Sequence, residues 1–279
     1  MIEYKNVSKS YGALRAVDNL NLRIESGAFF GLLGPNGAGK TTIIRMTTSL
    51  TPLTAGSIEV DGVPVRRDDA SIKRQFGIVP QYSNLEAELT ARENLEYHGR
   101  LYGMDRKQRR ARIEELLSFA ELTERADDPA KQFSGGMQRR LMIVKALMHS
   151  PSVLLLDEPT VGLDAAARRK IWDFLRVLNE QGLTVFLTTH YLEEAEALCG
   201  QVGLLQQGGL ICLGSPKEII GQTGAYVLEY FEDGKTRQEF YTEREMAVQR
   251  SMKLTCEFRI RQSNLEDAFV RMTNRGLGE

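Results

Sequence analysis

The sequence predicts an α/β protein built around a parallel β-sheet, and three stretches carry that prediction. An apolar run, Phe29 to Leu33, leads into the glycine-rich loop Gly34 to Thr41, and a helical pattern follows. A second apolar run, Val153 to Leu156, is short and uninterrupted, as in a strand buried on both faces. A third strand is expected over Leu183 to Leu187, shortly before His190. Parallel sheets bind ligands at the carboxyl ends of their strands, so the chemistry is expected at that edge.

Length, composition and charge describe an ordinary globular chain of 279 residues, 42% hydrophobic, with a formal net charge of −1. This balance gives no general attraction to nucleic acid, so no nucleic-acid partner is expected. Three cysteines (Cys199, Cys212 and Cys256) lack the close spacing of metal or redox motifs, which favours a reducing compartment. The chain begins without the apolar core of a signal peptide. No apolar stretch approaches the roughly 20 residues of a membrane-spanning helix, so any membrane must be crossed by another chain.

The first third of the chain is expected to form further strands around the glycine-rich loop. Ile2 to Leu22 alternates apolar and polar residues, which predicts half-buried antiparallel strands. After the helix and a turn, Ser57 to Gly62 and Phe76 to Val79 read as additional strands. This pattern predicts an antiparallel subdomain beside the parallel sheet.

From Ser83 to His149 the sequence turns helical and charged, which predicts an inserted helical subdomain over about 83–149. Helices are expected over Leu85 to Leu101 and Arg109 to Ala120. The basic run Arg106 to Arg112 is followed by acidic residues at helical pairing distance, so a solvated helix face is favoured over a nucleic-acid site. Four apolar residues near the start of the subdomain have two interpretations, core packing or anchors for a partner: Tyr82, Leu85, Tyr97 and Tyr102.

Beyond about residue 219 the character changes again, and a small α+β appendage is expected over 220–279. A hairpin is predicted around Asp233-Gly234, because this dipeptide favours a tight two-residue turn. Another strand is expected over Thr255 to Ile260. Ser263 to Glu266 reads as a capping box that opens a helix reaching Met272.

The glycine-rich loop between the first strand and its helix has the pattern of a phosphate-binding P-loop. Its backbone N–H groups and the helix N-terminus can converge on phosphate oxygens. Lys40 would place a positive charge near the β- and γ-phosphates, and the Thr41 hydroxyl would ligate a Mg²⁺ ion. The expected phosphate-binding residues are therefore Gly34, Pro35, Asn36, Gly37, Ala38, Gly39, Lys40, Thr41 and Thr42.

Three further features surround this loop in the predicted fold. Asp157 and Glu158 end the buried strand, where two carboxylates are costly unless a cation such as Mg²⁺ offsets them. His190 follows a strand that reaches the same sheet edge, within plausible reach of a γ-phosphate. Ser134-Gly135-Gly136 opens a helix and exposes N–H groups at the positive end of its dipole, which suits an anion.

In their order and approximate spacing, these motifs resemble those of the ATP-binding subunits of ABC transporters. The resemblance covers residues 1 to about 220 and rests on Tyr11, Gly34 to Thr42, Gln81, Phe133 to Gln138, Leu154 to Thr160, Gly162 to Asp164 and Thr188 to His190. It implies a P-loop ATPase fold of the ABC type, with an ATP-binding domain over 1–219. Phe133 and Met137 depart from the commonest signature and resemble the daunorubicin-type and nodulation-type exporters.

The resemblance also implies a role for each matching residue. Lys40 and the loop bind the phosphates of ATP, Glu158 is the catalytic carboxylate, and His190 is the switch histidine. The remaining residues contact the nucleotide or its Mg²⁺. Tyr11 stacks on adenine, and the metal is bound by Thr41, Gln81 and Asp157. The signature consists of Ser134, Gly135 and Gly136, and Asp164 belongs to the D-loop.

By resemblance, the chain is expected to bind and hydrolyse ATP with Mg²⁺ and to drive a separate transmembrane permease that works as an exporter. Its partners would be that permease and a second ATP-binding subunit, identical or different. It would then sit in the cytoplasm on the inner face of the membrane. The alternative is a soluble ABC-type ATPase of DNA maintenance or translation. That class is disfavoured because the chain has neither a long coiled-coil insertion nor a second ATPase copy.

Overall fold

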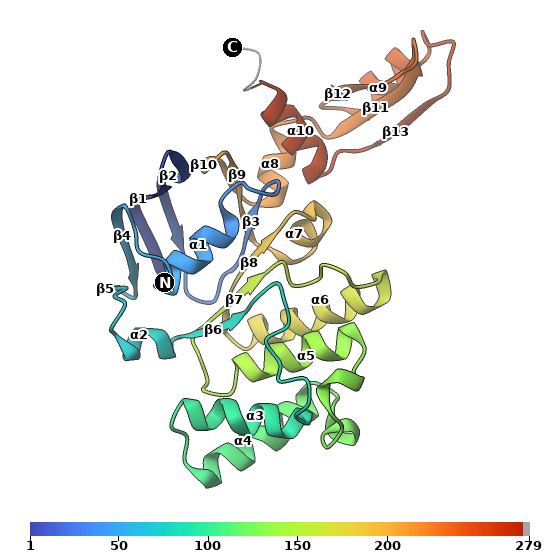
Figure 1. The fold of residues 1–279 in the computed structure, drawn as a ribbon. Helices are drawn as coiled ribbons and strands as arrows, with labels where there is room; N and C mark the ends of the chain where they lie inside the picture. The colour runs from blue at the N-terminus through green and yellow to red at the C-terminus, as the bar shows by residue number, and fades with distance from the viewer. Residues whose placement is uncertain (276–279) are drawn as a thin grey trace.

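The computed structural model describes residues 1–275 and contains three β-sheets with helices packed on and between them (Figure 1). The last residues of the predicted appendage, 276–279, lie outside the described residues. The N-terminal part forms an antiparallel sheet in the order β2-β1-β4-β5, as the alternating pattern predicted. Its strands are β1 (Ile2–Tyr11), β2 (Leu14–Ile24), β4 (Ala55–Val60) and β5 (Val63–Pro64).

The central sheet has six strands in the order β10-β9-β3-β8-β7-β6. All neighbouring pairs are parallel except β10 with β9, so the predicted parallel sheet is confirmed. The strands are β3 (Phe29–Leu33), β6 (Phe76–Val79), β7 (Val153–Asp157), β8 (Thr184–Thr189), β9 (Gln201–Gln206) and β10 (Gly209–Gly214).

Both faces of this sheet are buried, which explains its uninterrupted apolar strands. Alternate residues of a strand point to opposite faces. Leu154 and Leu156 accordingly join one hydrophobic cluster, while Val153 and Leu155 join another. The first cluster holds residues of α5 (Gly135–Ala146), α6 (Ala165–Glu180) and α7 (Leu192–Leu198). The second holds residues of α1 (Lys40–Thr47) and of the antiparallel sheet.

The inserted segment is helical as predicted, but its first two helices begin elsewhere. α3 spans Ala91–Leu101 rather than starting near Leu85, because Thr90 forms a capping box with Glu93. The loop before it is held by Asn94, whose side-chain amide donates to the carbonyl of Glu86. α4 spans Arg106–Phe119, starting before Arg109 because Asp105 caps its first backbone N–H groups. The short helices of this half are α2 (Ala70–Arg74), η1 (Thr123–Arg125) and η2 (Ala130–Gln132).

The C-terminal part forms a third, antiparallel sheet in the order β12-β11-β13, which projects away from the central sheet in Figure 1. The predicted hairpin is confirmed, because Asp233 and Gly234 join two paired strands with φ of 52° and 76°, as a type I′ turn requires. The predicted last strand lies slightly later than expected. The elements are α8 (Pro216–Gly221), β11 (Tyr226–Glu232), β12 (Lys235–Tyr241), α9 (Arg244–Ser251), β13 (Phe258–Gln262) and α10 (Leu265–Arg275).

The predicted capping box at the start of α10 is wrong by one residue. Asn264 and Asp267 make the reciprocal pair: each accepts, through a side-chain oxygen, a hydrogen bond from the backbone N–H of the other. Asp267 is buried and ion-paired with Arg261, whereas Glu266 is exposed. Leu265 and Ala268 of this helix join the large core cluster, so α10 packs on the part of the chain that holds the central sheet. The boundary at residues 219 and 220 stays a prediction.

Candidate active site

The glycine-rich loop connects β3 to α1 at the carboxyl edge of the central sheet. Two of its glycines are required by close backbone contacts. A Cβ on Gly34 would lie 2.3 Å from the carbonyl oxygen of Leu205. Gly39 caps α1 at a φ of 107°, and a Cβ there would lie 2.4 Å from the carbonyl oxygen of Ala16. Pro35, Asn36 and Gly37 are exposed, so the tip of the loop is open to a ligand.

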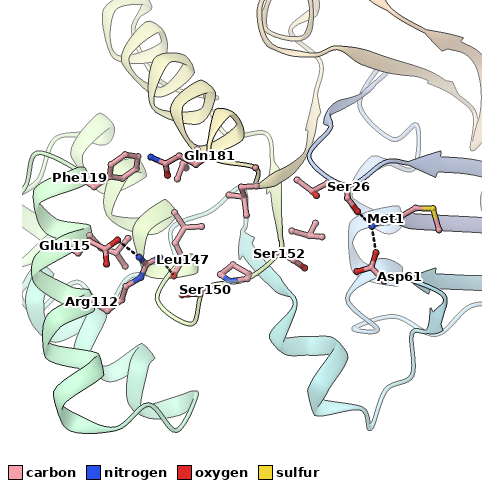
Figure 2. Close-up of a pocket in the computed structure, with 17 residues that line it drawn as sticks. Met1, Ser26, Asp61, Arg112, Glu115, Phe119, Leu147, Ser150, Ser152 and Gln181 are labelled. Carbon is pink, nitrogen blue, oxygen red and sulfur yellow. Dashed lines mark hydrogen bonds and ion pairs between the residues drawn. The ribbon is translucent and has the colours of Figure 1, made fainter.

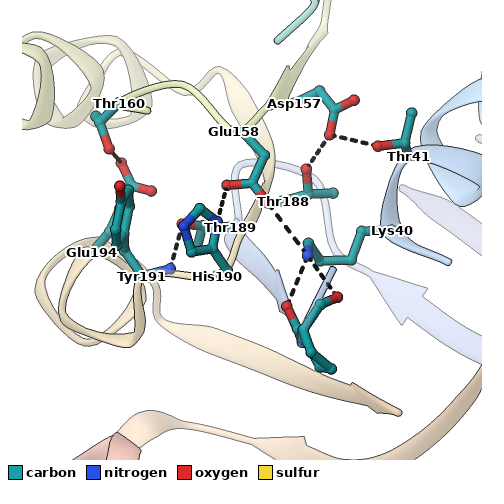
Figure 3. Close-up of polar contacts among 12 residues, drawn as sticks. Lys40, Thr41, Asp157, Glu158, Thr160, Thr188, Thr189, His190, Tyr191 and Glu194 are labelled. Carbon is teal, nitrogen blue, oxygen red and sulfur yellow. Dashed lines mark hydrogen bonds and ion pairs between the residues drawn. The ribbon is translucent and has the colours of Figure 1, made fainter. Parts of the chain in front are cut away.

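Lys40 is buried inside this loop and organises it. Its Nζ donates to the carbonyl oxygens of Gly34 at 2.7 Å and Pro35 at 3.2 Å, and lies 3.3 Å from Oε1 of Glu158 (Figure 3). Only 6% of the lysine side chain is exposed, so its charge is compensated by the carboxylate rather than by water. The ammonium therefore sits between the loop and β7, where it can attract an anionic group.

Asp157 ends β7 and is surrounded by hydroxyl groups. Its Oδ1 accepts from Thr41 at 3.2 Å and from Thr188 at 2.6 Å. Hydroxyl and carboxylate oxygens are the donors that Mg²⁺ prefers, so Thr41 and Asp157 fit the predicted metal site. The Gln81 side chain is exposed, and its contribution to the metal stays a prediction. No group of three or more His, Cys, Asp or Glu residues within 1–275 forms a protein-only metal centre.

Glu158 joins the loop to His190. Its Oε2 lies 2.7 Å from Nδ1 of His190, and its side chain is 7% exposed (Figure 3). Its backbone has a φ of 51°, which is uncommon for a residue other than glycine and is held by a hydrogen bond from its N–H to the carbonyl of Thr188. Strained backbones of this kind cluster at functional sites. The structure thus brings Lys40, Asp157, Glu158 and His190 together, as the sequence predicted.

Arg139 is a site residue that the sequence analysis missed. It lies in α5, is 6% exposed, and donates to the carbonyl oxygens of Pro80, Gln81 and Glu158. Burial lowers the pKa of this guanidinium, opposed by the nearby carboxylates of Glu194 and Asp157. Arg139 therefore ties the helix behind Ser134 to the segments that carry Gln81 and Glu158. An arginine in a helical pattern gives no sequence signal for this contact.

The other predicted residues lie on exposed surfaces. Ser134 caps α5 through a bond from the Met137 N–H, and Gly135 and Gly136 pack against the segment 163–167. Asp164 caps α6 and lines a hollow of about 240 Å³ together with Ser134. The end of β1 carries Tyr11, which is 47% exposed with the Lys9 ammonium 4.9 Å from its ring centre. Roles for these residues stay predictions.

A cavity of about 460 Å³ opens at the opposite edge of the central sheet (Figure 2). It lies between α4, the start of β7 and the chain start, where the Met1 ammonium bonds Ser26 and Asp61. Its lining contains none of the residues grouped around Lys40, so it is separate from the candidate active site. Within residues 1–275 no helix is both long and apolar enough to cross a membrane.

Comparisons with known proteins agree with this geometry. A model of the ABC transporter family matches residues 17–161. A "Nod factor export ATP-binding protein I" of Paraburkholderia xenovorans is 40% identical, covering 98% of this chain and 97% of that protein. The "Linearmycin resistance ATP-binding protein LnrL" of Bacillus subtilis is 43% identical over 80% of this chain and 72% of that protein. An ATP-binding cassette solved as a dimer, bound to ADP and Pi after hydrolysis, is 33% identical with a TM-score of 0.69, covering 77% of this chain and 98% of that one.

Proposed function

This chain belongs to the ABC transporter family, and on that basis we propose that it is an Mg²⁺-dependent ATPase that powers export through a separate transmembrane permease. Within the family, the ATP-binding subunit binds and hydrolyses ATP. The single observation that carries the site proposal is the cluster of Lys40, Glu158 and His190 at the mouth of the glycine-rich loop. The similarity to an export protein over nearly the full length of both chains, and to a resistance protein over 80% of this chain, supports the direction of transport. It also favours a transport role over DNA maintenance or translation.

In the proposed reaction, water attacks the γ-phosphorus of ATP, the bond between that phosphorus and the β–γ bridging oxygen breaks, and ADP and phosphate leave. The Glu158 carboxylate accepts the proton of the attacking water, and the loop N–H groups and Lys40 Nζ hold the phosphate oxygens. His190 keeps its ring beside Glu158 and stabilises charge on the transferred group. When bound to Thr41 and Asp157, Mg²⁺ supplies further charge compensation to the phosphates. Nucleotide entry would replace the contact between Lys40 and Glu158 that the structure shows.

The test compares Glu158→Gln with the parental chain. We expect the variant to bind ATP while its kcat falls roughly 10²–10⁴-fold, because an amide cannot take the proton. Phosphate release measures turnover, and calorimetry measures binding. Glu193→Gln is the matched control, since Glu193 is 75% exposed and its one recorded ion pair, to Arg168, is 4.0 Å long. Near-parental hydrolysis by Glu158→Gln would place the base elsewhere.

The partner proposal needs its own experiment. Purification of the tagged chain in detergent, with identification of the co-purifying proteins, should recover a multispanning membrane subunit. Recovery of a ribosomal or DNA-repair complex instead would contradict the transport role. Whether the second ATP-binding subunit is identical is decided by the same preparation.

A further inference from the structure

Glu194 is a fully buried carboxylate that the proposed reaction does not use. It lies in the first turn of α7, with 0% of its surface exposed. Acidic side chains are almost never so deeply buried unless they are paired. Its Oε1 accepts two hydrogen bonds, from the Thr160 hydroxyl at 2.9 Å and from the Trp172 indole Nε1 at 3.1 Å. One oxygen atom therefore joins α7 to the segment after β7 and to α6.

The surroundings of this carboxylate fix it as a hydrogen-bond acceptor. Burial raises the pKa of Glu194, and hydrogen bonds from Thr189, Thr160 and Trp172 oppose that rise. The Thr160 hydroxyl and the Trp172 indole N–H both donate to Oε1, so a single acceptor oxygen at that position satisfies both groups. Leaving two buried donors without an acceptor costs free energy of folding. The contact therefore stabilises the positions of the segments that carry Thr160 and Trp172 relative to α7.

The two segments that Glu194 joins are those that carry Glu158 and His190. Thr160 follows Glu158 closely in the chain, and His190 lies between two anchored positions, Thr188 and Glu194 (Figure 3). The first anchor is the bond of the Thr188 hydroxyl to Asp157 at 2.6 Å.

The second anchor, Glu194, is connected to His190 by backbone hydrogen bonds at the start of α7. The backbone N–H groups of Glu194 and Ala195 donate to the carbonyl of Tyr191, whose own N–H donates to the Thr189 hydroxyl. The turn carrying His190 is thereby fixed at both ends, and one end is the Glu194 carboxylate.

We propose that Glu194 is a positioning residue. It holds the turn that carries His190 in place beside Glu158 and does not itself touch the nucleotide. The inference rests on the proposed ATPase function and adds a residue to it. Its loss should let the His190 turn shift relative to Glu158. Such a shift reduces the stabilisation of the transition state more than it reduces the affinity for ATP. It therefore lowers kcat and leaves KM nearly unchanged.

The first experiment measures steady-state ATP hydrolysis by the full chain in complex with its membrane subunit. Glu194→Ala should lower kcat about tenfold and change the KM for ATP by less than about twofold. Glu194→Gln should return kcat to within about threefold of the parental value, because its amide oxygen accepts from Thr160 and Trp172. Glu193→Gln, on the exposed side of the same helix, should leave both constants unchanged. Equal losses in the alanine and glutamine variants would overturn the acceptor role.

Trp172 provides a second measurement that is independent of activity. It is the only tryptophan of the sequence, so its emission reports on the environment of Glu194. We expect the emission maximum to shift in Glu194→Ala and to stay at the parental value in Glu194→Gln. If Glu194→Ala fails to fold, Thr160→Val replaces it, and its kcat should fall about threefold in a variant whose thermal unfolding transition shows that it is folded.

The outcomes separate the inference from the proposed function. A parental complex without ATPase activity contradicts the proposed function. An active parental complex whose Glu194→Ala and Thr160→Val variants, both folded, keep the parental kcat overturns the positioning role alone.

Discussion

Glu158 has the least favourable backbone conformation among the residues grouped around Lys40, and three contacts hold it there. Its backbone N–H bonds the carbonyl of Thr188, while its carboxylate reaches Lys40 and His190. A left-handed φ costs a non-glycine residue of order 1–3 kcal/mol, which the surrounding bonds must offset. In this conformation the carboxylate contacts Lys40 of the glycine-rich loop on one side and His190 on the other. Function at this position is therefore tied to backbone geometry as well as to the side chain.

At the scale of single residues, the sequence predicted the charged cluster around Lys40 but not the residues that hold it in place. Lys40, Asp157, Glu158 and His190 were identifiable because each lies at or beyond the carboxyl end of a strand, and the strand's direction sets the sheet edge that it reaches. Arg139, Thr188 and Glu194 were not recognised as site residues. Each is an ordinary residue type within a helix or strand, and its role depends on a tertiary contact that no local pattern records.

His98 gives a prediction about stability and pH. Burial lowers its pKa from 6.5 to about 4, with smaller contributions from His149 and Lys145. The unfolded chain therefore takes up a proton, as the pH falls from 6.5 toward 4, that the folded chain does not. Stability is complete above pH 6.5 and declines through that window, by on the order of 1 kcal/mol near pH 5.

Urea unfolding near pH 7.5 and near pH 5 measures this effect, and His98→Leu is the comparison. The variant should lose less stability between the two pH values than the parental chain does. His149, whose pKa is also lowered by burial, remains in both proteins, so the difference isolates His98. An identical loss in both proteins would show that His98 is protonated equally in the folded and unfolded states.

Individual elements show where local signals suffice and where they do not. The Asp233-Gly234 turn was predictable because a two-residue hairpin demands positive φ at both positions, which few residue pairs supply. The start of α10 was not, because either Ser263 or Asn264 can cap a helix. The choice follows from Asp267, which is buried and paired with Arg261. That ion pair joins β13 to α10, so it belongs to tertiary structure.

The corrected capping box at α10 leads to a stability prediction. Asn264→Ala should destabilise the chain by about 1 kcal/mol, because it removes the acceptor for the Asp267 N–H. Glu266→Ala is the matched control, since Glu266 is exposed on the same turn, and it should stay within about 0.5 kcal/mol of the parent. Denaturant unfolding compares the three proteins. A larger loss of stability in Glu266→Ala than in Asn264→Ala would instead support the capping box between Ser263 and Glu266 that the sequence predicted.

On the scale of the whole molecule, the position of Ser134 predicts a dimer. Its hydroxyl caps α5 at an exposed surface beside Asp164, and its recorded side-chain bond is to Met137. The backbone N–H groups at the start of α5 would then complete a phosphate site on a second subunit. Glu158→Gln with ATP should be dimeric by light scattering, because the nucleotide persists between the subunits. Lys40→Ala is the control and should stay monomeric, since it lacks a charge that holds the phosphates. A strictly monomeric ATP-bound Glu158→Gln would contradict the arrangement.

Apolar side chains near the start of the helical subdomain are candidates for contact with the proposed membrane subunit. The structure divides the four apolar candidates into two kinds. Tyr82 and Tyr97 are 80% and 48% exposed, whereas Leu85 packs against the large core cluster and Tyr102 stacks on His149 with ring centres 3.7 Å apart. Exposed aromatic side chains are typical anchors of interfaces, whereas side chains that pack on the core cluster or stack on a neighbouring ring stabilise the fold. The two tyrosines are therefore the better candidates for the docking surface.

Tyr82→Asp tests this docking surface against the alternative of simple core packing. We expect the variant to keep the parental melting temperature and basal ATPase rate, because an exposed substitution changes stability by no more than about 0.5 kcal/mol. Transport in the reconstituted complex should fall sharply, since a charge replaces an apolar anchor. Leu85→Asp is the contrast, and burial of its unpaired carboxylate should lower the melting temperature of the isolated subunit, by several kcal/mol of lost stability. Normal transport in Tyr82→Asp and in Tyr97→Asp would place the permease contact elsewhere on the helical subdomain.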